Sequence, residues 1–206
     1  MIRLPVLVER SIADSEVART EVAEAFKAEV LSHAAEMGSH LSCRKGCSNC
    51  CYHPVLMTLL EGLTLYKWLH ENGLWTNALK ETLKKTARKT HNLPFEVWSL
   101  GLIPCPLLDD NGLCKAYEAR PFSCRITYST GDPKNCHPHS LGPGMFPKSA
   151  AFEKLTAAET PILRRHHLVH FRLPLAASVL YGELIAQGGL DLDDCQTALW
   201  KAPDGI

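Results

Sequence analysis

The sequence lacks long apolar runs, and this absence argues against a membrane protein. Its most apolar window, residues 173–184, is shorter than the roughly 18 uninterrupted apolar residues of a membrane helix and contains Glu183. The apolar stretch between Arg3 and Glu9 is too short for the core of a signal peptide, and no small-residue cleavage site follows it. We therefore expect a cytoplasmic protein that does not enter a membrane.

The sequence also lacks a net charge, because 22 Lys and Arg residues balance 22 Asp and Glu residues. No overall positive field attracts a polyanion, so we expect no nucleic acid partner. Common catalytic signatures are missing as well: there is no Gly-rich phosphate loop, no GxSxG elbow and no HExxH motif. A partner, if the protein has one, is expected to be another protein.

Alternating apolar runs typical of a sheet are missing too, whereas helical periodicity dominates both ends of the chain. Residues 11–37 repeat apolar side chains at every fourth position, and Thr58 with Glu61 forms a capping box that opens a helix ending at Gly73. Further helices are predicted over residues 76–90, 149–158, 161–171, 174–187 and 191–200. We expect a mainly α fold, with residues 1–206 forming one small helical domain.

The middle of the chain is different, since residues 92–147 show no helical periodicity and are rich in proline. So long an irregular stretch is unusual in a compact domain unless a ligand or metal orders it. Cysteines lie within this stretch and shortly before it. The predicted fold therefore has a cysteine-rich, loop-dominated metal-binding middle, at about residues 43–136, between helical segments 11–37 and 149–200.

Cysteine is the one residue type in clear excess, with nine in the chain and eight of them between Cys43 and Cys136. In a reducing compartment such a density favours metal binding over disulfides or unliganded core cysteines. The spacing of Cys47 and Cys50 lets two sulfurs hold one tetrahedral centre. The side chains of adjacent Cys50 and Cys51 are expected to diverge, toward different partners or opposite corners of a cluster. A single zinc finger does not explain this pattern.

Three motifs carry a resemblance to a known family: CxxGCxxCC over residues 43–51, CPLL over 105–108 and GxCxxYxxRPxxCR over 112–125. With the later lone Cys136, they resemble the YkgJ-type cysteine-cluster family, described as zinc- or iron-chelating. The pattern is also similar to the cysteine region of flagellin lysine N-methylases, which implies a 4Fe-4S cluster. The resemblance implies a metal-binding set of Cys43, Cys47, Cys50, Cys51, Cys105, Cys114, Cys124 and Cys136.

Eight thiolates suit either two four-sulfur zinc sites or one 4Fe-4S cluster with four thiols to spare. Adjacent Cys50 and Cys51, with the scattered second group, favour the iron–sulfur cluster over Zn²⁺. Arg120 and Arg125 are expected to offset the negative charge of the centre and donate hydrogen bonds to sulfur. Tyr117 is expected to pack over the cluster.

Two other functions fit the same residues. One is a metal-dependent enzyme, either related to protein lysine N-methylases or a redox protein. The other is a structural or assembly protein in which the metal only holds the fold together. Cys195 is interpreted as a plain buried cysteine. Five histidines are interpreted as packing or surface residues rather than ligands: His53, His137, His139, His166 and His170.

Overall fold

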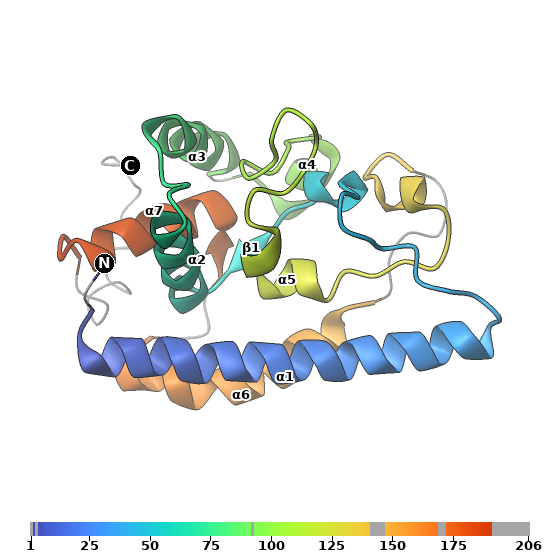
Figure 1. The fold of residues 1–206 in the computed structure, drawn as a ribbon, viewed down its shortest axis with the longest axis horizontal. Coiled ribbons are helices and arrows are strands. Elements are labelled where there is room, and N and C mark those ends of the chain that lie inside the picture. Colours follow the sequence, from blue (N-terminus) through green and yellow to red (C-terminus); the bar gives the residue numbers. More distant parts are fainter. Residues whose placement is uncertain (1, 3, 92, 141–146, 169–171, 191–206) are drawn as a thin grey trace.

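The computed structural model describes residues 2, 4–91, 93–140, 147–168 and 172–190, whose regular structure is almost entirely helical (Figure 1). The α-helices are α1 (Val6–Glu36), α2 (Leu59–Glu71), α3 (Asn77–Thr90), α4 (Phe95–Leu100), α5 (Phe122–Arg125), α6 (Ser149–Leu163) and α7 (Leu175–Ala186). Short 3-10 helices are η1 (Asn49–Tyr52), η2 (Tyr117–Ala119), η3 (Pro133–Cys136) and η4 (Arg164–His166). The predicted mainly α fold is confirmed. The helix predicted over 191–200, Cys195 and His170 lie outside the described residues.

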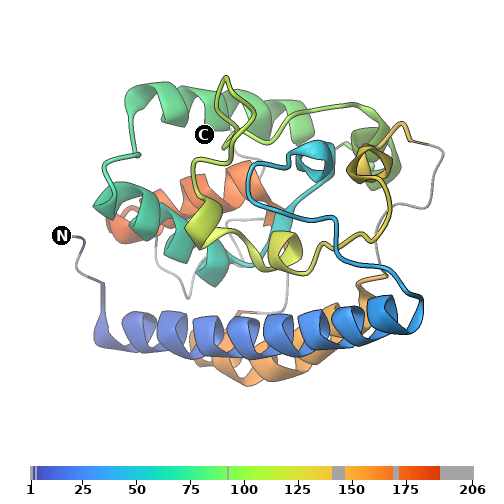
Figure 2. The same cartoon turned by 45° about the vertical axis from the view of Figure 1, so that its right-hand side comes forward.

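Helix α1 runs the length of one edge of the molecule, with α6 beside it (Figures 1 and 2). Its buried positions recur every three or four residues from Val8 to Ala34. In the N-terminal half several of these positions are polar, namely Ser11, Ser15 and Arg19. The helix also begins at Val6, earlier than the predicted residue 11, and the buried Val8 lies in this additional stretch.

Helix α6 continues through Pro161 and ends at Leu163. The prediction of separate helices over 149–158 and 161–171 is therefore wrong. Proline holds φ near the helical value, and its missing N–H removes only one hydrogen bond close to the helix end. The chain then turns through η4, and residues 169–171 lie outside the described part.

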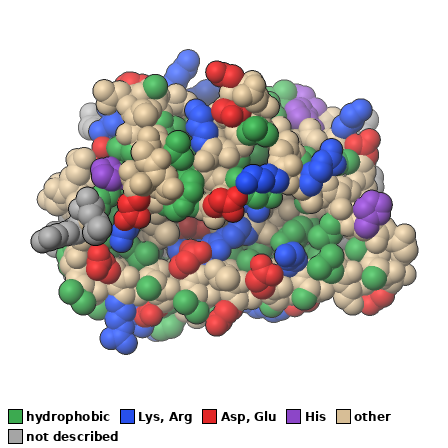
Figure 3. Space-filling model, viewed as in Figure 1, with side chains coloured by type: hydrophobic (Ala, Val, Ile, Leu, Met, Phe, Trp, Pro, Cys, Tyr) green, Lys and Arg blue, Asp and Glu red, His purple; other side chains and the backbone are tan. Residues whose placement is uncertain are grey.

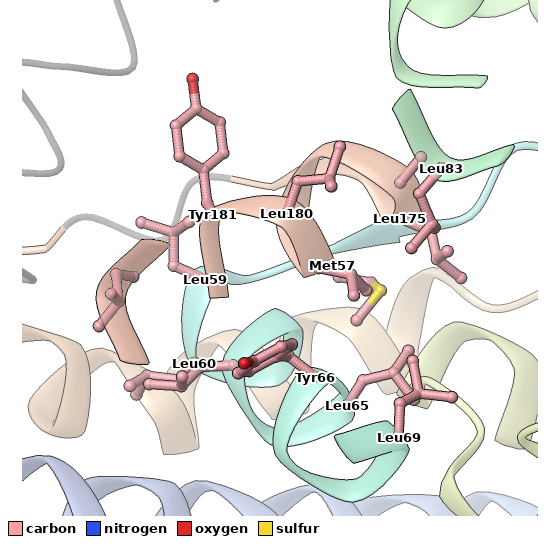
Figure 4. Packing of buried hydrophobic residues seen from close by; sticks show 14 of the residues in the cluster. Met57, Leu59, Leu60, Leu65, Tyr66, Leu69, Leu83, Leu175, Leu180 and Tyr181 are labelled. Atoms are coloured by element: carbon pink, nitrogen blue, oxygen red, sulfur yellow. The ribbon is translucent and has the colours of Figure 1, made fainter. Parts of the chain in front are cut away.

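The main core forms where α2 packs across α7, with α3 packed on α7 as well (Figure 4). Met57, just before α2, lies between these helices with no exposed surface, as do Leu60, Leu63 and Val179. Burying each such side chain stabilises the fold by about 1.5–3 kcal/mol.

The crossing of α2 and α7 depends on two glycines. A Cβ added at Gly62 would lie 2.3 Å from the carbonyl oxygen of Ser178, and one added at Gly182 would lie 2.8 Å from the Cα atom of Leu63. Glycine inside a helix costs roughly 1 kcal/mol relative to alanine. The close approach of the two helix backbones explains why both helices contain it.

Replacing Gly62 by alanine is expected to destabilise the protein by about 3 kcal/mol or more, because the atoms in the way belong to backbone and the helices must separate. Gly189→Ala is the matched control. A Cβ there would meet its nearest heavy atom at 3.5 Å, in ordinary contact, so its stability is expected to change by less than about 1 kcal/mol. Urea denaturation of both variants measures the difference, and equal midpoints would contradict the close-crossing explanation.

One small sheet joins segments far apart in the chain. Strand β1 (Leu56–Met57) pairs antiparallel with β2 (Leu173–Pro174), in the register Leu56 to Pro174 and Met57 to Leu173. Each strand has only two residues, too few for an alternating pattern to be visible in the sequence. The pairing ties the start of α2 to the start of α7.

The middle segment has more local structure than predicted, since α4, α5 and two 3-10 helices interrupt its loops. Helix α5 carries Phe122, which is buried with Ile126 in a second, smaller core against α1 and α6. Their partners in this core are Ala23, Phe26, Val30, Ala151 and Leu155. The middle is therefore clamped to both terminal helical segments.

The surface agrees with the balanced composition. On the face shown in Figure 3, basic and acidic side chains are interspersed rather than gathered by sign. None of the helices in the described part of the chain combines the length and the apolar character needed to cross a bilayer.

Candidate metal centre

One cavity of about 320 Å³ contains the thiols singled out from the sequence. It is enclosed by the loop before α2, the middle segment, Lys27 of α1 and residues at the start of α6 and α7. The cysteines in its wall are Cys43, Cys47, Cys50, Cys51, Cys105, Cys114, Cys124 and Cys136. The fold thus brings to one place residues that are far apart in the chain, while their role as ligands remains a prediction.

The first four cysteines lie on a tightly turned segment. Gly46 adopts φ +89°, which allows the chain to turn just before Cys47. The backbone N–H of Cys47 donates to the carbonyl of Arg44 at 3.1 Å, and that of Cys51 donates to the carbonyl of Ser48 at 2.9 Å. These turns, followed by η1, direct the four thiols toward a common space.

Backbone pairing connects the second cysteine group to the first. The N–H of Cys105 donates to the carbonyl of Cys51 at 2.8 Å. Cys114 returns to the same region through a bridge with Leu108. The turn between them is held by the Asp109 carboxylate, which accepts from the backbone N–H of Leu113 at 2.7 Å.

Cys124 lies on α5, which two carboxylates hold in place. Glu61 is buried and accepts a hydrogen bond from the backbone N–H of Phe122. Glu16 of α1 pairs with the guanidinium of Arg125 at 2.9 Å. Thr58 caps α2 as predicted, but Glu61 is used as an anchor for α5.

Cys136 and Cys43 are held by contacts with His53 and with the segment that follows α5. The Nε2 atom of His53 lies 2.7 Å from the carbonyl oxygen of Cys136, so this histidine contacts backbone. The N–H of Ser42 donates to the carbonyl of Ser129 at 2.8 Å, and the thiol of Cys43 lies 3.7 Å from the carbonyl of Thr127.

The other described histidines also have contacts of their own. The ring of His137 packs on Tyr52, with centroids 5.3 Å apart. The Nε2 atom of His139 lies 2.9 Å from the carbonyl oxygen of Leu100, and that of His166 lies 2.9 Å from the hydroxyl of Ser11. His53 is also among the residues that line the cavity. The interpretation of the four as packing or surface residues rather than ligands stays a prediction.

The charges of the cavity wall have one sign. Among the residues that the structure describes, no Asp or Glu lines the cavity, whereas several cations do. These cations are Lys27, Arg44, Arg120, Arg125 and Lys148. A wall of this charge favours binding of a negatively charged group. Metal centres ligated by four thiolates carry about two negative charges and are such a group.

Lys148 is a functional candidate that sequence reasoning missed. Its ammonium donates to the hydroxyl of Thr127 at 3.2 Å. Burial lowers its pKa, while the thiols of Cys124 and Cys50 act in the opposite direction. Lys148 follows the irregular segment without any motif around it, so only its position in the fold identifies it.

Arg120 and Tyr117 form one unit in the wall. The guanidinium carbon of Arg120 lies 3.9 Å from the centroid of the Tyr117 ring, and its Nε atom donates to the carbonyl of Tyr117 at 3.1 Å. The charge of Arg120 helps to lower the pKa of Cys50 and opposes the rise at Cys114. These positions are compatible with the predicted roles of both residues around a metal–sulfur centre.

Three buried polar atoms in the described part of the chain have no hydrogen-bond partner of ordinary length: Ser123 Oγ, Arg125 Nε and Ser129 Oγ. All three belong to residues that line the cavity. The hydroxyl of Ser129 faces the Cys136 thiol and opposes the rise in its pKa that burial causes. Unpaired buried donors are costly, and sulfur ligands in the cavity would supply acceptors for them.

Burial raises the pKa of most of the thiols, but at Cys50 a larger effect lowers it. Burial raises the pKa of Cys105 to about 12 and also raises the pKa of Cys124. The exception is Cys50, whose pKa a hydrogen bond from the Cys51 thiol lowers to about 7, with help from Lys148. How the sulfurs of adjacent Cys50 and Cys51 divide between ligand positions stays a prediction.

The donor set fits a metal centre with thiolate ligands. One zinc with four thiolates at 2.3 Å would place its sulfurs about 3.8 Å apart. In the described residues no three Cys, His, Asp or Glu side chains gather closely enough to hold a single ion. The thiols instead surround a wider common space, alongside cations and unpaired donors suited to sulfur.

Comparison with known proteins agrees with this donor set. No curated protein and no solved structure shows a significant match to the chain. Residues 42–155, more than half of the chain, match the CxxCxxCC family, whose description is "Putative zinc- or iron-chelating domain". The matched stretch contains every cysteine of the cavity wall. The chain therefore belongs to the CxxCxxCC family of zinc- or iron-chelating domains.

Proposed function

We propose that this protein holds an iron–sulfur cluster of the 4Fe-4S type in the cysteine-lined cavity. The observation that carries the proposal is a single cavity with eight thiols, several cations and, among the described residues, no carboxylate in its wall. Thiolates are the usual ligands of such clusters, which transfer one electron when bound. Eight thiols around one cavity are more than a single zinc ion uses, which supports a polynuclear centre.

The chain's own residues have defined tasks in this proposal. Arg120 and Lys148 bring positive charge next to the thiols, and the hydroxyls of Ser123 and Ser129 offer hydrogen bonds to sulfur. Arg125 has its guanidinium paired with Glu16. Its charge is therefore partly offset, while its unpaired Nε–H remains a donor.

Anaerobic purification followed by metal and sulfide analysis tests the proposal. We expect a brown protein with a broad absorption near ~400 nm, iron and acid-labile sulfide. Cys124→Ser is expected to lose most of the metal, since a hydroxyl is a far poorer ligand than a thiolate, whereas Cys195→Ser is the control and keeps it. A colourless, sulfide-free protein loaded with zinc would refute the iron–sulfur proposal.

A further inference from the structure

Arg125 reaches from the cavity wall to helix α1. Its Nη1 atom donates to Oε1 of Glu16 at 2.9 Å and to the hydroxyl of Thr20 at 3.3 Å, and its Nη2 atom lies 3.4 Å from Oε2 of Glu16. The Nε atom of the same guanidinium is buried and has no hydrogen-bond partner among the described residues. Because a guanidinium is planar, the pairing of its two terminal nitrogens with Glu16 also fixes the direction of the Nε–H.

Glu16 can fix this direction because a second arginine holds it in turn. Its Oε2 atom accepts from the Nε and Nη2 atoms of Arg19 at 3.2 Å and 3.0 Å. Arg19 is fully buried, and its Nη1 atom donates to Glu159 of α6 at 3.0 Å and to Ser15 at 2.7 Å. Burial acts to raise the pKa of Glu16, but the charges of Arg19 and Arg125 lower it. A row of paired charges thus leads from the contact between α1 and α6 to the cavity wall.

Arg120, another arginine of the wall, is held differently. Its guanidinium lies on the ring of Tyr117, and its Nε–H donates to the carbonyl of Tyr117 at 3.1 Å. The Nε–H of Arg120 is therefore already used within its own segment, whereas that of Arg125 is left over. An unpaired buried donor is costly, and Arg125 lines the cavity beside Cys124. A sulfur bound in the cavity is a suitable acceptor for this donor.

We infer that Glu16 is a positioning residue for the metal centre, because it holds the Arg125 guanidinium in the orientation that presents the Nε–H to a sulfur in the cavity. Glu16 does not line the cavity itself, so it acts through Arg125 and not as a ligand. The inference rests on the proposed function in taking a centre with sulfur ligands as the occupant of the cavity. Hydrogen bonds to sulfur and nearby positive charge favour the more reduced, more negative state of a cluster. The reduction potential therefore reports on the position of Arg125.

A double-mutant cycle read from the reduction potential tests this role. The four proteins, purified anaerobically with their metal, are the parent, Glu16→Ala, Arg125→Leu and the double variant. We expect Glu16→Ala to keep its metal and to lower the potential toward that of Arg125→Leu, since a guanidinium without its anchor no longer presents the Nε–H. In the Arg125→Leu background the same substitution should not lower the potential. An unchanged potential in Glu16→Ala, or a rise in both backgrounds from the loss of the carboxylate charge alone, would overturn the inference.

Glu24→Gln is the matched control. Glu24 lies further along α1 and pairs at 3.6 Å with Lys27, another cation of the cavity wall, but both of these side chains are exposed. Exposed pairs are screened by solvent, so we expect the potential of this variant to stay close to that of the parent. A fall as large as in Glu16→Ala would overturn the inference, because any carboxylate of α1 would then have the same effect.

If Glu16→Ala does not fold, Arg125→Lys decides. Lysine keeps the positive charge beside Glu16 but has no Nε–H of a guanidinium. We expect its potential to fall toward that of Arg125→Leu, and a potential equal to that of the parent would overturn the inference.

Element and sulfide analysis of the parent decide the proposed function separately. If the cavity holds zinc, that function fails, and the cycle is read from the rate at which an alkylating reagent modifies the bound thiolates, which a hydrogen bond to sulfur slows. We then expect faster alkylation in Glu16→Ala than in the parent, and no such increase in the Arg125→Leu background. Equal rates in the parent and Glu16→Ala would overturn the inference.

Discussion

Complete removal of the metal under reducing conditions is expected to unfold the segment between α3 and α6. Without metal, the eight thiols and several cations surround a cavity of about 320 Å³ that water would enter. The segment has few periodic apolar residues whose packing could order it in place of the lost metal–sulfur bonds. Structural zinc sites contribute about 10–16 kcal/mol in small domains, comparable with the about 5–15 kcal/mol that stabilises a whole protein.

Circular dichroism and hydrogen exchange measure this effect. Helix content should fall and amides of α5 should lose protection, because the small core around Phe122 and Ile126 depends on the same segment. Amides at the α2 and α7 crossing provide the internal control, and we expect them to be the last to exchange. Unchanged dichroism and thermal stability after verified metal removal would contradict the coupling of metal binding to folding.

Replacing Arg19 by methionine is expected to destabilise the protein by about 3–5 kcal/mol, because it removes a buried cation that lies against buried carboxylates. Arg19 has no exposed surface, and its guanidinium lies 3.0 Å from a carboxylate oxygen of Glu159 and 2.7 Å from the hydroxyl of Ser15. Its charge also opposes the rise that burial causes in the pKa of Glu61. The loss of this cation would therefore weaken the packing of α2 and α6. Through Glu61, it would also weaken the anchoring of the start of α5.

The pH dependence of this variant has a defined sign. Burial already raises the pKa of Glu61 in the folded protein, and removing Arg19 raises it further. A raised folded pKa means that the folded state binds the proton more tightly than the unfolded state. The stability difference between variant and parent should thus be smallest below the ordinary pKa of a glutamate and grow as pH rises through the folded pKa.

Lys154→Met is the matched control for Arg19→Met. Lys154 of α6 pairs with Glu29 of α1 at 2.6 Å, across the same pair of helices, but both side chains are more than half exposed. Exposed pairs contribute about 1 kcal/mol or less, so this variant should lose little stability. Denaturant titrations at several pH values compare the two. Similar losses for both variants, or a loss at Arg19 that does not vary with pH, would contradict the role given to the buried cation.

The sequence by itself determined the helical class, the position of most helices and the cysteines that share the cavity. Helical periodicity is a local property, as is the Thr58 cap of α2, and both can be read without knowledge of the fold. The cysteine spacing indicated chelation for the same reason, since the four cysteines of residues 43–51 are close in the chain. The CxxCxxCC family match to residues 42–155 agrees with that interpretation.

Only the tertiary structure decided which residues surround the thiols and which contacts hold them. Lys148 and Ser129 line the cavity because separate segments meet there, and no local pattern records that meeting. In the sequence, Glu61 looked like half of a capping box. In the structure its carboxylate accepts a hydrogen bond from the distant backbone N–H of Phe122. The burial of Arg19 in α1 could not be read from the sequence, because a buried guanidinium is stable there only with a carboxylate supplied by α6.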